Sequence, residues 1–267
     1  MKILFLGDIV GNVGCNAIKS NISNIIKTKK IDFVIVNGEN SYSTGVGITE
    51  NIANEFFSCG IDVITTGNHV WDQKETFEHI QTEKRLLRPK NMSKDLPGNG
   101  FGIFLSKNGF KIGVLNLMGN VFMKKSDDVF QISKEFLSKY KLKQHYDFLV
   151  VDFHGEITSE KMAIGHFFDG MATMVVGTHT HVPTNDSRIL DNGTAYQTDA
   201  GMCGDYNSVI GMNKEYSLNK FLKINSGKKK PSEGEASICG VIVEADIKTG
   251  LAKNVDSFIY GGELNKK

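Results

Sequence analysis

Short apolar runs along this sequence end in residues that could bind a metal ion. Carboxylate, amide and imidazole groups are the ligands that hard and borderline divalent cations use, and such cations activate water for hydrolysis. No cysteine is among them, which argues against a structural zinc site. Each residue alone could be a helix cap, a turn former or a buried core histidine, but their recurrence at successive run ends predicts a metal centre. They are Asp8, Glu39, Asn40, Asn68, His154, His179 and His181, with His69 beside Asn68.

The apolar runs have the length of buried strands, and helical patterns separate the first three of them. A β-α-β-α-β order predicts parallel strands joined by right-handed crossovers. Ligand sites in parallel α/β folds form outside the carboxyl ends of the strands, so this topology would gather the candidates along one edge. The expected strands cover 2–6, 33–36, 63–65, 148–151 and 174–176, with helices over 16–30 and from an N-cap at Thr49 through 57.

Two hairpins are expected besides the parallel strands. Asn108-Gly109 separates apolar runs over 101–105 and 110–117, and Asn192-Gly193 marks a second hairpin. We interpret Gly201–Gly204 as a flexible loop. The simplest organisation is one α/β domain over residues 1–267 with β-hairpin additions. Further helices are expected over 129–140 and 159–168, and further strands over 238–244 and 255–260.

Composition excludes several classes of protein. Hydrophobic residues make up 40% and charged residues 23% of the 267 residues, a balance typical of globular proteins. The net charge of +1 argues against a stable nucleic-acid complex. No run is long and apolar enough for a membrane span, and the first apolar run is too short for a secretory signal. The four scattered cysteines suggest reduced thiols in a cytoplasmic protein.

The order of the motifs resembles the calcineurin-like metallophosphoesterase superfamily, whose members hydrolyse phosphoesters at a binuclear metal centre. Two departures stand out: Val10 occupies a position where that superfamily has His, and Glu39 one where it has a bridging Asp. Both departures resemble the YmdB-type branch of 2′,3′-cyclic nucleotide 2′-phosphodiesterases. The stretches that carry the similarity are 7–11, 37–40, 67–72, 152–156, 158–161 and 198–202, with His179-Thr180-His181.

This resemblance implies a fold of largely parallel β-sheets sandwiched by helices in αββα order. It also implies two metal ions per chain, iron in the first place and manganese or zinc as alternatives. Glu39 would bridge them, and a hydroxide held by the two ions would attack phosphorus in a 2′,3′-cyclic nucleotide. Metal one would take Asp8, Glu39, Asn40 and His181, and metal two Glu39, Asn68, His154 and His179.

The resemblance further implies that His69 donates a proton to the departing ribose oxygen, with Asp72 placed to orient it. Asp152 or Glu156 could accept the free ring N–H of His154, as metal-bound histidines usually require. A homo-oligomer is expected from the resemblance, and no substrate-contacting residue is predicted.

Two other functions remain open at the level of sequence. The same metal centre would serve a broad phosphomonoesterase or protein phosphatase, because the centre recognises phosphate and not the rest of the substrate. A metal-binding, RNA-associated regulatory protein with little catalysis is the third hypothesis, although the small net charge speaks against strong RNA binding.

Overall fold

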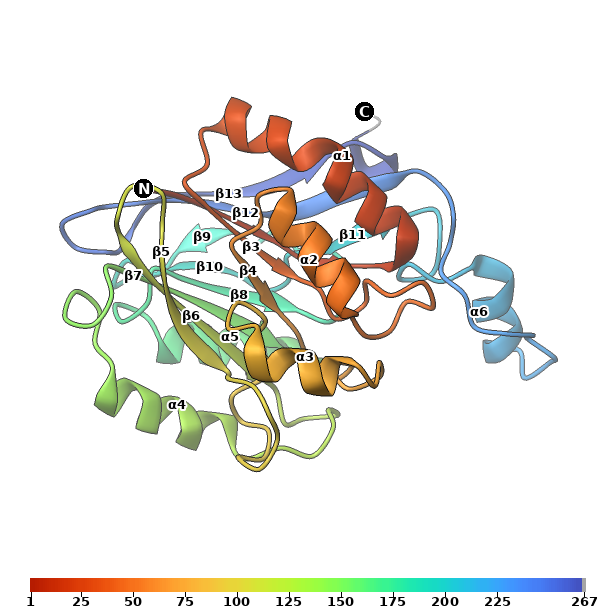
Figure 1. Ribbon diagram of the computed structural model, residues 1–267, viewed down its shortest axis with the longest axis horizontal. Coiled ribbons are helices and arrows are strands. Elements are labelled where there is room, and N and C mark those ends of the chain that lie inside the picture. The colour runs from red at the N-terminus through yellow and green to blue at the C-terminus, as the bar shows by residue number, and fades with distance from the viewer. Residues whose placement is uncertain (266–267) are drawn as a thin grey trace.

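Two β-sheets, packed face to face, form the centre of the computed structural model, which describes residues 1–265 (Figure 1). The first sheet contains parallel pairs at its β1–β3 and β3–β4 contacts, as the sequence predicts, but its central strand β12 runs antiparallel to β1. In order, this sheet consists of β2 (Asp8–Ile9), β11 (Met202–Asp205), β12 (Ala236–Ala245), β1 (Lys2–Leu6), β3 (Phe33–Asn37) and β4 (Val63–Thr65), with β13 (Ala252–Tyr260) paired to β12.

The second sheet has a parallel centre flanked by two antiparallel pairs. Both predicted hairpins are confirmed, since Asn108-Gly109 joins one antiparallel pair and Asn192-Gly193 the other. In order, the sheet consists of β5 (Phe101–Leu105), β6 (Lys111–Met118), β7 (Phe148–His154), β8 (Met174–Thr178), β10 (Ala195–Gln197) and β9 (Arg188–Ile189).

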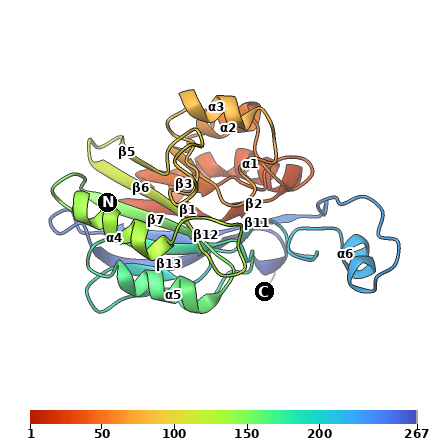
Figure 2. The ribbon, with the colours of Figure 1, turned by 90° about the horizontal axis from the view of Figure 1, so that it is seen from below.

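Alternation along the strands builds the layers. Ile3 and Phe5 of β1 pack between the sheets against residues such as Val150 and Met174, whereas Leu4 and Leu6 face the helical layer. Figure 2 shows the helices on the two outer sides, so the predicted αββα order is confirmed. One outer layer holds α1 (Gly11–Lys29), α2 (Glu50–Ser58) and α3 (Thr76–Thr82), and the other holds α4 (Val129–Lys139) and α5 (Thr158–Phe167).

Two predicted segments differ from the structure. The expected loop Gly201–Gly204 is wrong, because Met202–Asp205 form the buried strand β11 between β2 and β12. Helix α1 begins at Gly11 and not at residue 16. The first turn of α1 lies against β11, and a Cβ on Gly14 would come within 2.2 Å of the Cys203 carbonyl oxygen. Glycine therefore takes the place of an apolar side chain in this turn, and the apolar period that predicts a helix begins only after it.

One element stands apart from the layers. Helix α6 (Lys214–Phe221) lies in the long connection between β11 and β12 and projects from the body (Figures 1 and 2). The chain of described residues ends in a short 3-10 helix, η1 (Glu263–Asn265). Within residues 1–265, none of the helices has both the length and the apolar character needed to span a membrane.

Candidate metal centre

The predicted ligands come together, but from two sheets and not from the edge of one. Asp8, Glu39 and Asn40 follow β1 and β3 of the first sheet, whereas His154 ends β7 of the second sheet. The sheets are stacked with these strand ends on the same side, and the Glu39 Oε1 atom lies 2.9 Å from His154 Nε2. Asn68 follows β4, and His179 and His181 follow β8.

His154 Nε2 is the point on which three ligand atoms converge. Glu39 Oε1 lies 2.9 Å, Asn68 Oδ1 3.1 Å and His179 Nδ1 3.0 Å from this nitrogen. Glu39, His154 and His179 offer ligand atoms that all lie within 4.8 Å of one another, and Glu39 and His154 are buried. This arrangement could hold a cation.

A second group of donors surrounds Asp8. Its Oδ2 accepts the backbone N–H of His179 at 3.1 Å, but its fully buried Oδ1 has no hydrogen-bond partner within the described residues. His181 Nε2 lies 3.9 Å from that oxygen, too far for a hydrogen bond. The Asn40 amide donates to the Gly45 carbonyl, which leaves its buried Oδ1 without a partner as well. Buried oxygens are rarely left unpaired, so these two fit a cation that would satisfy them.

Each of the three histidines has one ring nitrogen held by a hydrogen bond outside the cluster. His154 Nδ1 bonds to Thr178 Oγ1 at 2.9 Å, and His181 Nδ1 bonds to the Ile210 carbonyl at 2.9 Å. His179 uses Nε2 instead, 3.0 Å from Glu156 Oε2. The other nitrogen of each ring is therefore left toward the site carboxylates or the neighbouring histidine, which is the arrangement of metal-binding histidines.

The partner of His154 is a threonine and not the expected Asp152 or Glu156. Thr178 Oγ1 accepts from the histidine and donates to Asp152 Oδ1 at 2.7 Å. Asp152 also accepts from Asn37 and Thr65, so the carboxylate acts on the ring only through the hydroxyl. Glu156 contacts His179. Asp152 and His154 lie two positions apart on the same face of β7, and the Thr178 hydroxyl of the neighbouring strand β8 bridges the two side chains.

The electrostatics of the cluster set distinct protonation states. Burial would raise the pKa of Glu39, but the charge and hydrogen bond of His154 outweigh it and lower the pKa to about 2. Burial would lower the pKa of His154, but Glu39 and Asp8 raise it to about 9. Burial and the charge of His154 lower the pKa of His179 to about 3, so this ring is neutral with a free Nδ1 lone pair. Burial raises the pKa of Asp8.

His69 lies at the open side of the cluster. Its backbone N–H donates to Glu39 Oε2 at 3.0 Å, and its Nδ1 lies 2.6 Å from Asp72 Oδ2, as the sequence predicts for an orienting carboxylate. The turn that carries it requires glycine at position 67, because a Cβ there would lie 2.1 Å from the His154 ring. His69 Nε2 has no partner within the described residues and lines the same cavity as Glu39 and His181.

The loop that carries His179 and His181 is held in an uncommon backbone conformation. The φ angles of these residues are 94° and 66°, in the left-handed region that non-glycine residues rarely adopt. Between them, the backbone N–H and the hydroxyl of Thr180 both donate to Asp199 Oδ2. The Lys161 ammonium donates to the same oxygen at 2.6 Å and to the Thr180 hydroxyl at 3.0 Å. This buried network holds Thr180, and with it the backbone conformation of the two flanking histidines. The sequence predicted no role for Lys161 or Asp199.

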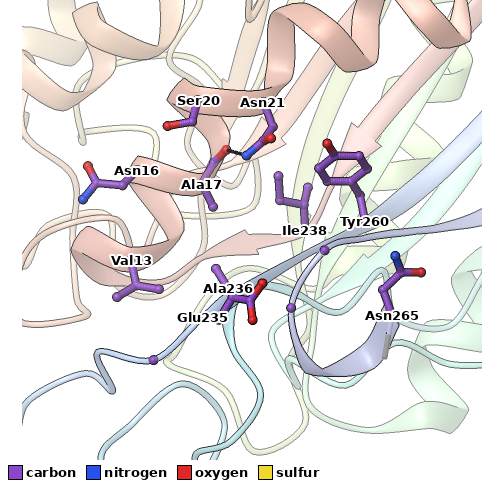
Figure 3. Close-up of a pocket in the computed structure, with 13 residues that line it drawn as sticks. Val13, Asn16, Ala17, Ser20, Asn21, Glu235, Ala236, Ile238, Tyr260 and Asn265 are labelled. Carbon is purple, nitrogen blue, oxygen red and sulfur yellow. Dashed lines mark hydrogen bonds between the residues drawn. The ribbon is translucent and has the colours of Figure 1, made fainter. Parts of the chain in front are cut away.

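The candidate residues share a cavity of about 300 Å³. Glu39, Asn40, His69, His179 and His181 line it. A more open cavity of about 710 Å³ lies elsewhere, between α1, the start of β12 and the end of β13 (Figure 3). The side chains that line it include amides, Ser20 and Tyr260 but no histidine and none of the predicted ligands, so the chemistry belongs to the smaller cavity.

The chain is similar to known proteins over almost its whole length. The family model of YmdB-like proteins matches residues 4–258. A 2′,3′-cyclic-nucleotide 2′-phosphodiesterase of Bacillus subtilis (strain 168) is 39% identical over 263 residues, which cover 98% of each chain. The crystal structure of a novel phosphatase from Mycoplasma pneumoniae has a TM-score of 0.89 at 36% identity, covering 97% of this chain and 93% of the other. A hypothetical protein from Thermus thermophilus also has a TM-score of 0.89, at 34% identity, covering 97% of this chain and 99% of the other.

Proposed function

Because this chain belongs to the YmdB-like family, we propose that it is a metal-dependent phosphodiesterase that hydrolyses 2′,3′-cyclic nucleotides. One observation supports the proposal beyond family membership. The side-chain oxygens of Asp8, Glu39 and Asn40 lie close to three imidazole rings, and one nitrogen of each ring is held by a hydrogen bond outside the cluster, so that the other nitrogen is left for a metal. The proposal treats residues 1–267 as one catalytic domain, since both sheets contribute ligands.

The donor set fits two cations that share Glu39. Asp8, Asn40 and His181 would hold one ion with Glu39, and Asn68, His154 and His179 the other. Bound divalent ions would supply Lewis-acid activation of water and neutralise charge on the phosphoryl oxygens. Oxygen and imidazole ligands suit iron, manganese or zinc, and we propose iron with the other two as alternatives.

The protein itself would position the phosphate and manage one proton. Asp72 fixes His69 Nδ1–H, so a protonated His69 presents its second proton at Nε2 toward the cavity. That proton would pass to the ribose oxygen as the P–O bond breaks. The exposed Asp72 carboxylate also has Lys124 Nζ at 3.7 Å, which holds the carboxylate beside the imidazole.

Turnover of defined phosphoesters tests the proposal. The manganese- or iron-loaded protein is incubated with 2′,3′-cyclic AMP, 3′,5′-cyclic AMP and p-nitrophenyl phosphate, and the products are separated. We expect turnover to favour the 2′,3′ ring, with the 3′-phosphate as product because the 2′ ester is cleaved. Preference for the monoester would instead assign the centre to a phosphomonoesterase, and absence of turnover on all three would refute the proposal.

His69→Gln isolates the proposed proton donor. A positioned general acid is worth about 10²–10⁴-fold, and because an amide can still hydrogen-bond the phosphate, we expect kcat to fall about 10²-fold with little change in KM. His145→Gln, whose ring accepts the Lys141 N–H far from the site, is the matched control. A variant that keeps the wild-type kcat would contradict the assignment of His69 as the acid.

Metal affinity is expected to rise with pH. In the metal-free protein the pKa of His154 is raised to about 9, so near neutral pH this ring is protonated, and a cation can use Nε2 only after the proton leaves. Between pH 7 and 9 the Mn²⁺ association constant should therefore increase about tenfold per unit, with about one proton released. Calorimetry in buffers of different ionisation enthalpy measures both. A pH-independent constant over this window would contradict the assignment of His154 as a ligand.

A further inference from the structure

One wall of the cavity is formed by a segment that the proposed chemistry does not use. We define the arm root as residues 209–213 and 229–232, the two segments of chain that lead toward α6 and back from it. Its side chains Ile210, Met212 and Lys229 line the cavity together with Glu39, His69 and His181. Figure 1 shows α6 standing away from the body, and no residue of α6 is among those that line the cavity.

The arm root is fixed to the loops that carry the candidate ligands. Met212 forms isolated antiparallel bridges with Val209 and Pro231, and the second of these joins the two segments of the arm root. Met212 is buried with Val10, two positions after Asp8 in the sequence, and a Cβ on Gly45 would lie 2.6 Å from the Met212 Cε atom. This packing means that the wall is present before any substrate binds.

Lys229 brings an unneutralised charge to the wall. Its ammonium has no hydrogen bond or ion pair within the described residues, whereas the neighbouring Lys230 lies 3.8 Å from Glu233. Burial and the charge of Lys220 lower the pKa of Lys229, against the opposing effect of Asp72. Asp72 itself is engaged by His69 at 2.6 Å. Lys229 is an exposed cation that forms no ion pair within the described residues, and its place on the wall of the cavity that Glu39 and His69 line suits it to bind an anion.

Ile210 brings an apolar surface in a strained conformation. Its φ is 47°, a region that β-branched residues adopt only at a cost, yet the residue is 52% exposed and is not part of a hydrophobic core. The carbonyl of the same residue holds His181 Nδ1 at 2.9 Å, which keeps the side chain beside a candidate ligand. An exposed apolar side chain on the cavity wall, held there by a left-handed backbone, is placed to contact a ligand in the cavity.

We propose that the arm root recognises the substrate: Lys229 binds an anionic phosphoryl oxygen, and Ile210 packs against the attached nucleoside. The inference rests on the proposed function and names its specificity residues. A cavity of about 300 Å³ is at the small end of ligand sites and suits a single nucleotide.

Binding without turnover tests the assignment. Dissociation constants of inorganic phosphate and of 3′-AMP are measured by calorimetry on the manganese-loaded protein. Lys229→Met should weaken both about tenfold, because a charge-assisted hydrogen bond is lost. Ile210→Ala should weaken 3′-AMP about fivefold and leave phosphate unchanged, since alanine removes only apolar contact. Lys228→Met, from the same lysine run but outside this cavity, is the control and should change neither.

The outcomes separate this inference from the proposed function. If Lys229→Met binds both ligands like wild type, the phosphate contact is refuted, and if Ile210→Ala weakens both ligands equally, the nucleoside contact is refuted. If the wild-type protein binds phosphate through Lys229 but does not turn over 2′,3′-cyclic AMP, the phosphate contact stands and the proposed function fails. With an active enzyme, Lys229→Met should also raise KM about tenfold with kcat nearly retained.

Discussion

Glu39→Gln is expected to abolish most of the phosphodiesterase activity while the protein stays folded. The carboxylate is buried, Oε1 lies 2.9 Å from His154 Nε2, and Oε2 accepts the His69 N–H at 3.0 Å. The low pKa of about 2 means that it is ionised under all working conditions. Gln keeps the size but offers one neutral oxygen, so it cannot bridge two cations. Loss of one preorganised electrostatic contact costs about 10²–10³-fold, and because Glu39 would serve both ions, we expect at least the upper value in kcat/KM.

Metal content and folding distinguish this effect from simple destabilisation. The variant should bind fewer than two Mn²⁺ ions per chain and keep the wild-type circular dichroism spectrum. Glu83→Gln makes the same change at a carboxylate paired with Arg85, and should leave activity and metal content unaltered. An active Glu39→Gln enzyme with two bound ions would overturn the bridging assignment.

The predictable part of the fold depends on local patterns. Apolar runs such as Phe33–Val36 and the Asn108-Gly109 turn act over a few residues, so strands and hairpins follow from sequence alone. The candidate ligands were found for the same reason, since each directly follows such a run. Helix α6 escaped prediction because only Ser217 in it is buried, and an exposed helix shows no apolar period.

The supporting residues could not be predicted because their contacts join distant parts of the chain. Lys229 reaches the cavity only because β11 and β12 bring the arm back to Asp8 and Gly45. Ile210 acts partly through a carbonyl, a group that every residue carries. The stretches around Lys161 and Asp199 were noted for their resemblance to the YmdB-type branch, but spacing gave no reason to pair two residues that lie 38 positions apart.

Lys161→Met is expected to destabilise the protein more than removal of any surface ion pair, and to weaken metal binding as well. Lys161 and Asp199 are both almost fully buried, so the substitution leaves a buried carboxylate without its cation. Breaking such a pair costs about 3–5 kcal/mol. Lys19→Met is the matched control, because its ammonium lies 2.7 Å from Glu55 in a half-exposed pair, for which a loss of about 0–1 kcal/mol is expected.

The effect on metal binding identifies Lys161 as a positioning residue. Lys161 and Asp199 hold Thr180, which lies between two histidines whose φ angles of 94° and 66° the loop alone would not favour. Once this restraint is lost, the histidines relax toward ordinary conformations, and we expect Mn²⁺ affinity to fall about 10–100-fold under conditions where the variant is still folded. Lys161→Met/Asp199→Asn, which removes the uncompensated charge, should regain part of the stability without regaining the affinity. The free energy of unfolding and the Mn²⁺ affinity should therefore respond differently in the double variant. A double variant that recovered both would show that Lys161 contributes only to folding.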